Sequence, residues 1–439
     1  MTGRASRHAL VVLLLLGPVL ASACLFSKPL ELQRSQAVSA AAQTAPQRPV
    51  PASLFGINVI GLRFGTPMPD LRIGAWRSFD STWYRVEPSR GSWALDELDR
   101  EVEWASNHGV KLLMLLGNPP EWASSQPTTP GWFSGAPNGT TAPPRDMEDW
   151  RTYVRTLATR YRGKVEGFEL WNEPNNFFRG SAHELVALCR EARAVIKQIA
   201  PELKVISPAV SLGGLPFLEK FLAAGGGDTF DVLAVHFYVA PGRGDRRPRP
   251  PEDMLPKIEA VQEMMKRHAV DKPLWNTETG WAVVNKRPTT AGEGEGFVGT
   301  ALSDEASSAF VARAYVLTWA AGIERLYWYS WGARGMSLVE PDEHTPKASA
   351  RAYDEVQRWL VGLTVRSCEL GHDKTWLCTA ETTTRSPRCI VWRLDRATRP
   401  IKEGCTRIRY RNLSGEVREL HGEAIEVGPS PILLEGTDN

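Results

Sequence analysis

The chain has 439 residues, of which 42% are hydrophobic and 23% charged, and its formal net charge is +2. This composition is ordinary for a globular protein and is sufficient for one large domain and a smaller one. Because the two signs of charge are interspersed and form no basic stripe, the composition argues against nucleic acid as a partner.

The first segment of the chain has the composition of an export signal. Basic residues precede the apolar run ALVVLLLLGPVL, and small residues then lead to Cys24. This order predicts a signal peptide over residues 1–23, with a retained anchor helix as the alternative. Residues 24–50, rich in Ala, Gln, Ser and Pro, predict a flexible tether.

Cys24 stands where bacterial lipoproteins carry their lipidated cysteine. Plain cleavage after the small residues would instead release a secreted protein. We therefore expect a location in the bacterial cell envelope or outside the cell, with contact to a membrane only through a lipid at Cys24.

Short apolar runs alternate with longer amphipathic segments between residues 54 and 360. The runs cover residues 54–60, 79–86, 111–117, 167–174, 204–210, 231–239, 272–281 and 325–331. The segments between them, such as 93–110, 146–163 and 304–322, carry apolar side chains at helical spacing. Eight such units predict a parallel (β/α)8 TIM barrel over residues 51–363. An open, doubly wound sheet is the alternative, weakened because no glycine-rich phosphate loop follows the first run.

After residue 363 the helical rhythm gives way to short stretches divided by turn residues. They predict a small all-β, sandwich-like domain over residues 364–439. In an exported chain, Cys368, Cys378, Cys389 and Cys405 could form two disulfides, whose pairing the spacing leaves open. Their spacing does not suit a zinc ribbon, so we expect disulfides and no metal there.

Two glutamates stand at the ends of the fourth and seventh predicted strands. Glu173, in ELWNEPNN, ends the fourth run, where Pro174 stops the strand. Glu278, in WNTETGW, ends the seventh. Since active sites of such barrels form at the C-terminal ends of the strands, both carboxylates should face one mouth. Paired carboxylates are the apparatus of glycoside hydrolysis, although each alone could be an ordinary strand-end acid.

The neighbours of these glutamates resemble the clan A retaining glycoside hydrolases, most of all family 39 and its bacterial relatives. WNEP on the fourth strand and WxTExGW on the seventh carry the resemblance, together with blocks at residues 76–93, 112–124 and 147–175. The similarity covers residues 54–360. It implies a general acid/base at Glu173 and a nucleophile at Glu278, about 5–5.5 Å apart. The acid role also implies that burial and the neighbouring charge raise the pKa of Glu173.

The resemblance implies further side chains around the two glutamates. Asn172 would bond the 2-hydroxyl of the reacting sugar, and Arg77 would lie beneath Glu278 and keep it ionised. Tyr238 would hydrogen-bond Glu278, and His236 would line the sugar site. Each has a structural alternative: loop capping for the asparagine, a surface position for the arginine and core packing for the histidine.

Other candidates lie near the same strand ends. Asn118, after the third strand, is a candidate ligand for a sugar hydroxyl. Trp328 and Trp331 on the eighth strand are candidates for the floor on which the sugar stacks. Glu169 should share the face of Glu173 and could pair with the arginine of the second strand.

Three long segments should frame the cleft. They cover residues 118–148, 239–256 and 282–304. The first contains Trp132 and Phe133. The second is rich in arginine and could meet the uronic acids of an anionic polysaccharide or simply face solvent.

These features together predict an exported retaining glycoside hydrolase that acts on a polysaccharide or oligosaccharide. No HExxH motif, metal-spaced cluster or phosphate loop occurs, so we expect no cofactor and no metal. Xylosidase, glucanase and exopolysaccharide-depolymerase activities all remain open. The alternative is a barrel lipoprotein that binds cell-surface glycan without cutting it, although such a protein has no need of a positioned nucleophile. The oligomeric state stays open.

Overall fold

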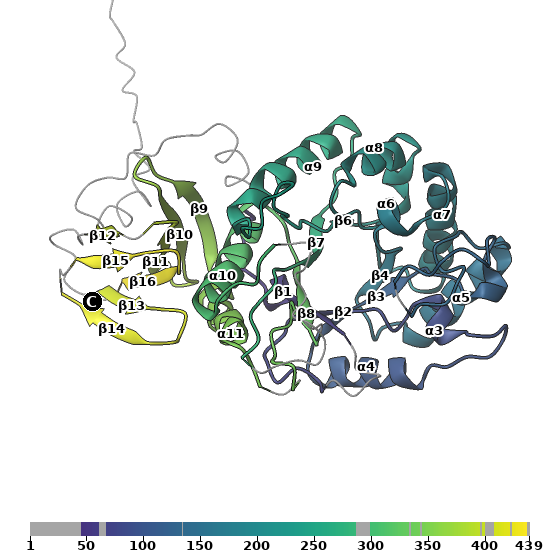
Figure 1. Ribbon diagram of the computed structural model, residues 1–439, viewed down its shortest axis with the longest axis horizontal. Helices are drawn as coiled ribbons and strands as arrows, with labels where there is room; N and C mark the ends of the chain where they lie inside the picture. Colours follow the sequence, from purple (N-terminus) through teal and green to yellow (C-terminus); the bar gives the residue numbers. More distant parts are fainter. Residues whose placement is uncertain are drawn as a thin grey trace, which may run out of the picture.

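The computed structural model describes residues 45–60, 67–133, 135–286, 299–332, 335–342, 345–395, 397–399, 408–421 and 424–436. The predicted signal peptide, Cys24 and Cys405 lie outside the described residues. A ring of strands enclosed by helices lies beside a smaller β-domain (Figure 1). No helix in the described ranges combines the length and the apolar character needed to cross a membrane.

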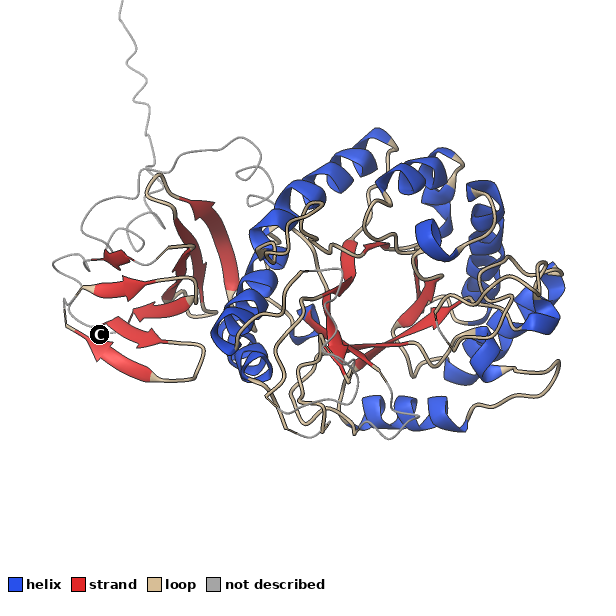
Figure 2. Cartoon of the chain, in the orientation of Figure 1, coloured by secondary structure: helices blue, strands red, loops and turns tan. Residues whose placement is uncertain are grey.

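The larger domain is a (β/α)8 barrel. Its parallel strands are β1 (Phe55–Val59), β2 (Ala75–Ser78), β3 (Lys111–Leu116), β4 (Gly167–Leu170), β5 (Lys204–Ile206), β6 (Leu233–Val235), β7 (Leu274–Thr279) and β8 (Leu326–Trp331). They follow the order β5-β4-β3-β2-β1-β8-β7-β6, and bridges Ile206–Val232 and Val210–Val235 join the two ends. The predicted barrel is confirmed, and the open-sheet alternative is excluded because the sheet closes on itself (Figure 2).

Helices cover the outside of this ring. The longer ones are α4 (Asp96–Asn107), α5 (Met147–Tyr161), α7 (Ala182–Ile199), α8 (Leu215–Ala223), α9 (Leu255–Arg267), α10 (Asp304–Ala320) and α11 (Ala348–Leu360). The local sequence determines where several of these helices begin. Ser181 and Glu184, for example, form a capping box at the start of α7. Helix α10 is buried along most of its length because α11 and the β-domain cover its outer side.

The second strand differs from the prediction. The run at residues 79–86 was expected to be a strand, but β2 ends at Ser78 and Trp83–Val86 forms the short helix α3. Trp83 is fully buried and stacks on the ring of Tyr153 at 5.0 Å. This aromatic packing buries the run at residues 79–86 although the run is not a strand.

Strand parity decides which side chains enter the barrel. The interior contains Ala75, Leu113, Trp275 and Tyr327 among a small buried cluster, whereas Trp76, Leu112 and Phe168 belong to the layer between strands and helices. Because successive side chains of a strand point to opposite faces, Arg77 lies on the same side as Ala75. The inward positions nearest the strand ends therefore form the floor of the barrel mouth.

The C-terminal domain is antiparallel. One sheet has the order β14-β13-β16-β11-β10-β9, and β12 pairs with β15 in a separate ribbon. The bounds are β9 (Thr364–Leu370), β10 (Thr375–Glu381), β11 (Pro387–Arg393), β12 (Ala397–Arg399), β13 (Ile408–Arg411), β14 (Val417–Leu420), β15 (Ile425–Val427) and β16 (Ile432–Gly436). The prediction of a small all-β domain after the barrel is confirmed.

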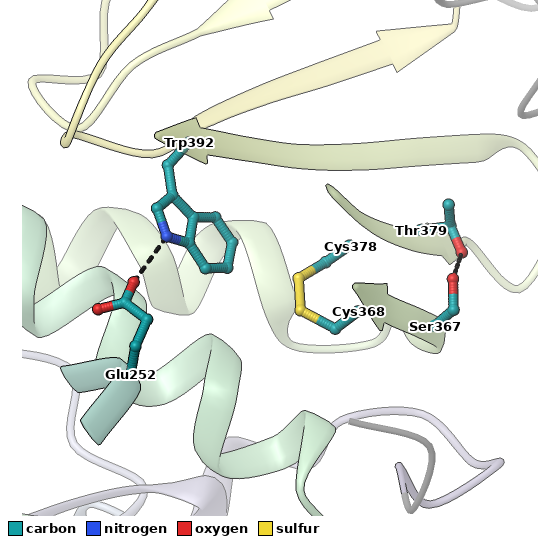
Figure 3. Close-up of a disulfide and its surroundings, with 6 residues drawn as sticks. All are labelled: Glu252, Ser367, Cys368, Cys378, Thr379 and Trp392. Carbon is teal, nitrogen blue, oxygen red and sulfur yellow. Dashed lines mark hydrogen bonds between the residues drawn. A yellow bond between two sulfur atoms is a disulfide. The ribbon is translucent and has the colours of Figure 1, made fainter. Parts of the chain in front are cut away.

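A disulfide and a partly buried hydrogen bond stabilise this domain and its contact with the barrel (Figure 3). Cys368 on β9 is bonded to Cys378 on β10. Cys389 is a buried free thiol among the described residues, and Cys405, the fourth candidate, lies outside them. Trp392 Nε1 on β11 donates to Glu252 Oε1 at 2.8 Å, where Glu252 lies on the turn η5 (Pro251–Met254) of the barrel.

Helix α4 carries a buried carboxyl on its barrel-facing side. Glu101 is 1% exposed and accepts a hydrogen bond from Ser78 Oγ at 2.5 Å. Burial raises the pKa of Glu101 well above its usual value, and the nearby carboxylate of Asp80 raises it further. The surroundings of Glu101 therefore favour its protonated form.

Candidate active site

Glu173 is held in an uncommon backbone conformation directly after β4. It precedes the short helix α6 (Pro174–Phe177), with φ of 44°, and Trp171 has φ of 69°. Left-handed conformations of non-glycine residues cost about 1–3 kcal/mol, and they persist where surrounding structure imposes them. Between them, Asn172 pairs with Ala209 in an isolated bridge beside β5. The chain thus turns sharply where strand four ends, and this turn places Glu173 at the barrel mouth.

Glu278 lies across the mouth from Glu173, near the end of β7. One carboxylate oxygen of each glutamate and a ring nitrogen of His236 lie within 4.8 Å of one another. His236 Nδ1 is 2.8 Å from Glu173 Oε1 and 3.9 Å from Glu278 Oε2. Retaining glycosidases separate their carboxyl groups by about 5–5.5 Å and inverting ones by about 6.5–9.5 Å. The arrangement fits the retaining class.

Two donors orient the Glu278 carboxylate. Arg77 Nη1 donates to Oε2 at 2.9 Å, and the Tyr238 hydroxyl donates to Oε1 at 2.9 Å. Each oxygen therefore has its own donor from a different strand or strand end. This fixes the plane of the carboxylate.

Arg77 is the centre of a wider buried network. Its Nε and Nη2 donate to the two oxygens of Glu169 at 3.1 and 2.6 Å, which confirms the expected inner ion pair. Nη2 also donates to Asn172 Oδ1 at 2.8 Å, and Nη1 to Asn58 Oδ1 at 3.1 Å. Burial disfavours the charge of Arg77, but the carboxylates of Glu169 and Glu278 raise its pKa above the usual value. The guanidinium thus remains charged while fully enclosed.

The pKa shifts of the two glutamates differ from the prediction. Burial alone would raise the pKa of Glu173, but hydrogen bonds from His236 and Asn176 lower it below its usual value. Burial raises the pKa of Glu278, and the charge of Glu173 raises it further, against the lowering effects of His236 and Arg77. The expected high pKa of Glu173 is therefore wrong for this structure. The pKa is lowered because His236 Nδ1 lies 2.8 Å from Glu173 Oε1, a contact that the order of residues in the sequence did not reveal.

The two tryptophans proposed as a stacking floor point the wrong way. Trp328 and Trp331 are each 1% exposed and belong to the large hydrophobic core, and Trp331 Nε1 donates to the Pro67 carbonyl at 2.9 Å. Trp328 stacks on Trp281 with ring centroids 5.5 Å apart. Tyr329, between them, faces the site instead: it is partly exposed, and burial together with the charges of Glu278 and Glu173 raises its pKa. The aromatic face that β8 offers to a sugar is that of Tyr329.

Asn118 also has a different position from the one expected. Its side chain is fully buried, and Nδ2 donates to the carbonyl of Thr140 at 3.1 Å. The residue has φ of 56° at the start of the long segment that follows β3. Asn118 therefore anchors this segment and presents no accessible surface to a sugar hydroxyl.

Sequence reasoning missed some residues of the site. Asn58 on β1 contacts Arg77, and Asn176 Nδ2 donates to Glu173 Oε2 at 3.1 Å. Asn58 was detectable as the polar residue of an otherwise apolar run. Tyr329 was detectable from strand parity, because it lies two positions after the inward-facing Tyr327.

Glu173, His236 and Glu278 are also the one group of potential metal ligands found among the described residues. The Arg77 guanidinium, 2.9 Å from Glu278, opposes a second cation there. Carboxylates with separate donors and a cationic neighbour suit acid–base and nucleophilic chemistry on a neutral sugar better than cation binding.

The arginine-rich segment after β6 is partly neutralised by its own acids. Arg247 pairs with Asp245 at 2.9 Å, and Arg249 pairs with Asp253. These pairs reduce the positive charge that an anionic glycan would meet. The structure therefore weakens the hypothesis of a site for uronic acids.

Comparisons with known proteins agree with this geometry. A β-xylosidase from Caldicellulosiruptor saccharolyticus is 29% identical over 181 residues, which are 38% of this chain and 36% of the relative, so the match spans about a third of that protein's length. A family 39 glycoside hydrolase from Bacteroides cellulosilyticus WH2 superposes with a TM-score of 0.64 at 20% identity, over 89% of this chain and 81% of the other.

A monomeric β-xylosidase from Caulobacter crescentus CB15 has the same fold, with a TM-score of 0.60 at 15% identity, over 89% of this chain and 97% of the other. The family model of Glycosyl hydrolases family 39 matches residues 65–300, more than half of the chain, and this region includes both glutamates of the barrel mouth. The chain belongs to glycosyl hydrolases family 39.

Proposed function

We propose that the protein is a retaining glycoside hydrolase with Glu278 as nucleophile and Glu173 as general acid/base. The observation that carries this proposal is the convergence of the two carboxylates and His236 within 4.8 Å. Carboxylate oxygens this close fit the short separation of retaining enzymes better than the wider separation of inverting ones.

In the first step, Glu278 attacks the anomeric carbon and the bond to the leaving oxygen breaks. Glu173 gives its proton to that oxygen, so the leaving group departs as an alcohol. In the second step, Glu173 takes a proton from water, whose oxygen displaces Glu278 and releases the sugar. Arg77 and Tyr238 hold Glu278 during both steps, each at 2.9 Å.

Asn172 is positioned to bind the sugar between the carboxylates. Its Oδ1 accepts from Arg77 at 2.8 Å, which leaves the amide nitrogen as the end that can donate to a 2-hydroxyl. A bond to this hydroxyl strengthens as positive charge develops on the ring, and this lowers the barrier.

The pKa of Glu173, which lies below its usual value, has to rise before this carboxyl can act as a general acid. A sugar that fills the gap removes the remaining water from Glu173, which is already largely buried, and so raises the pKa of its carboxyl. We infer that binding of the sugar prepares Glu173 for its role as an acid.

The relatives direct the choice of substrates. A β-xylosidase matches part of the sequence, and a glucosidase from Croceicoccus marinus shares the fold with a TM-score of 0.60 at 16% identity, over 91% of this chain and 98% of the other. We propose β-xylosides and β-glucosides, as aryl glycosides and as oligosaccharides, for a first panel. Polysaccharides complete it.

The decisive experiment compares the wild type with Glu173→Gln, Glu278→Gln and the control Glu121→Gln. Glu121 is an exposed residue of the turn η3 (Glu121–Ala123), so its substitution should leave hydrolysis intact. We expect both site variants to lose hydrolysis and a 2-deoxy-2-fluoro glycoside to label Glu278 covalently. Glycan binding without turnover or labelling would refute the proposal and favour a non-catalytic binding barrel. An inverted anomer as product would refute the retaining mechanism.

We also propose that the protein is exported and that Cys24 carries a lipid. The order of basic, apolar and small residues before Cys24 motivates this, and the disulfide between Cys368 and Cys378 fits an oxidising compartment. In a bacterial host, metabolic labelling with a fatty-acid analogue should mark the wild type and not Cys24→Ser. Labelling of neither, with the mature protein in the medium, would indicate plain secretion.

A further inference from the structure

A cluster of aromatic side chains lies beside the site and takes no part in the proposed chemistry. It consists of Phe79, Trp132, Phe133 and Phe177, which we call the aromatic wall. Trp132 stacks on Phe79 with ring centroids 6.1 Å apart and meets Phe133 and Phe177 edge to face at 5.0 and 6.0 Å. Its members come from three separate segments: after β2, between η3 and α5, and within α6.

The wall is continuous with the proposed catalytic residues on two sides. The ring of Phe79 lies 4.6 Å from the guanidinium carbon of Arg77, which binds Glu278. Phe177 is on α6, the helix that begins directly after Glu173. The wall therefore borders the space in which the reacting sugar would lie.

The wall is not an ordinary part of the core. Phe133 is 44% exposed, one of few large apolar side chains so exposed among the described residues, and Trp132 is only partly buried. Trp132 Nε1 is sheltered from solvent and has no acceptor within the part of the chain that the structure describes. An unsatisfied buried donor is unfavourable, so the present packing leaves Trp132 with an unmet hydrogen bond.

Polar contacts hold the segment that carries Trp132. Asn118 Nδ2 holds the Thr140 carbonyl at 3.1 Å, and Ser124 Oγ donates to the Gly139 carbonyl at 2.8 Å. Because these polar contacts close the segment at its base, an exposed phenylalanine near its tip is not needed to hold it.

We propose that Trp132 and Phe133 form a subsite for the sugar ring next to the reacting one. A pyranose offers an apolar face for aromatic stacking and hydroxyl oxygens that can accept from an indole N–H. The wall supplies both, directly beside the catalytic carboxylates. This inference rests on the proposed function and assigns the protein to substrates of at least two sugar units.

The first test compares substrates of different length with Trp132→Ala and Phe133→Ala. The substrates are a trisaccharide and a glycosyl fluoride of the same sugar; the fluoride contains only the reacting ring. We expect each substitution to reduce kcat/KM about tenfold more for the trisaccharide than for the fluoride, mainly because KM for the trisaccharide rises. Leu394→Ala, which removes another exposed apolar side chain, 55% exposed and on the β-domain, is the control. Equal losses on both substrates, or no loss on either, would overturn the inference.

The second test does not depend on turnover. Calorimetric titration of the Glu278→Gln protein with xylotriose and cellotriose measures binding directly. Adding Trp132→Ala should weaken binding of the preferred trisaccharide about tenfold, and Phe133→Ala serves if the tryptophan variant fails to fold. Unchanged affinity, or no binding of either trisaccharide, would refute the subsite. Weakened binding in a protein whose wild type hydrolyses nothing would support the subsite and refute the proposed function.

Discussion

Arg77→Met tests whether the buried network beneath Glu278 has the energetic role that its contacts indicate. Methionine keeps most of the length of the side chain and removes the charge. Glu169 and Glu278, which contact the Arg77 guanidinium at 2.6 and 2.9 Å, then lose the cation that they share. Removing one partner of a buried ion pair costs about 3–5 kcal/mol, and we expect a value near the upper end because two carboxylates lose the same partner.

The cost should depend on pH in a definite direction. Arg77 lowers the pKa of Glu278, so its stabilising effect is present where the carboxylate is ionised and is lost as the pH falls and the carboxylate binds a proton. Urea unfolding at pH 8 and at pH 5 should therefore show a smaller difference between wild type and variant at the lower pH. The catalytic profile should change too, with the acidic limb of kcat/KM displaced to higher pH.

A double-mutant cycle with Glu169→Gln isolates the pair. The double variant should be less destabilised than the sum of the two single variants, because the second substitution removes one of the unpaired charges. Arg160→Met is the control: Arg160 pairs with Asp99 on the surface, where such pairs contribute about 0–1 kcal/mol. A cost for Arg77→Met as small as that of the control, or one that grows as the pH falls, would refute the reasoning.

Three further predictions concern single side chains. In His236→Phe the hydrogen bond that lowers the pKa of Glu173 is absent, so the alkaline limb of the pH profile of kcat/KM should move to higher pH. An alkaline limb at unchanged pH would show that Glu173 is not the general acid. Tyr238→Phe removes a donor to Glu278, and since a hydrogen bond to a charged group contributes about 1.5–3 kcal/mol, kcat/KM should fall about 10- to 100-fold in a steady-state assay. The pKa of Glu101 is raised in the folded state, so the stability that this carboxyl contributes is complete below its unfolded pKa and is lost as the pH rises through its folded pKa. Glutamine has no such proton to lose. The melting temperature of Glu101→Gln, relative to that of the wild type, should therefore rise between pH 5 and pH 8. A constant difference would contradict the buried, protonated carboxyl.

Much of the fold could be predicted because its signals are local. Apolar runs alternating with amphipathic segments indicated the barrel, and the loss of helical spacing after residue 363 indicated the β-domain. The position of Glu173 was readable for the same reason: a proline directly after it ends the strand, and strand ends of one polarity meet at one mouth. The error at residues 79–86 arose where packing around Trp83, and no local pattern, determined the backbone.

The amino-acid sequence by itself therefore determined the barrel, its order of strands and the two glutamates at their ends, since each depends on a few neighbouring residues. Closure of the barrel decided the rest. It set the inward face of β8, which turned Tyr329 and not its tryptophan neighbours towards the site, and it brought His236 to 2.8 Å from Glu173 and so reversed the expected pKa shift. Contacts between side chains on separate strands depend on register and parity around the whole ring, and no short stretch of sequence contains that information.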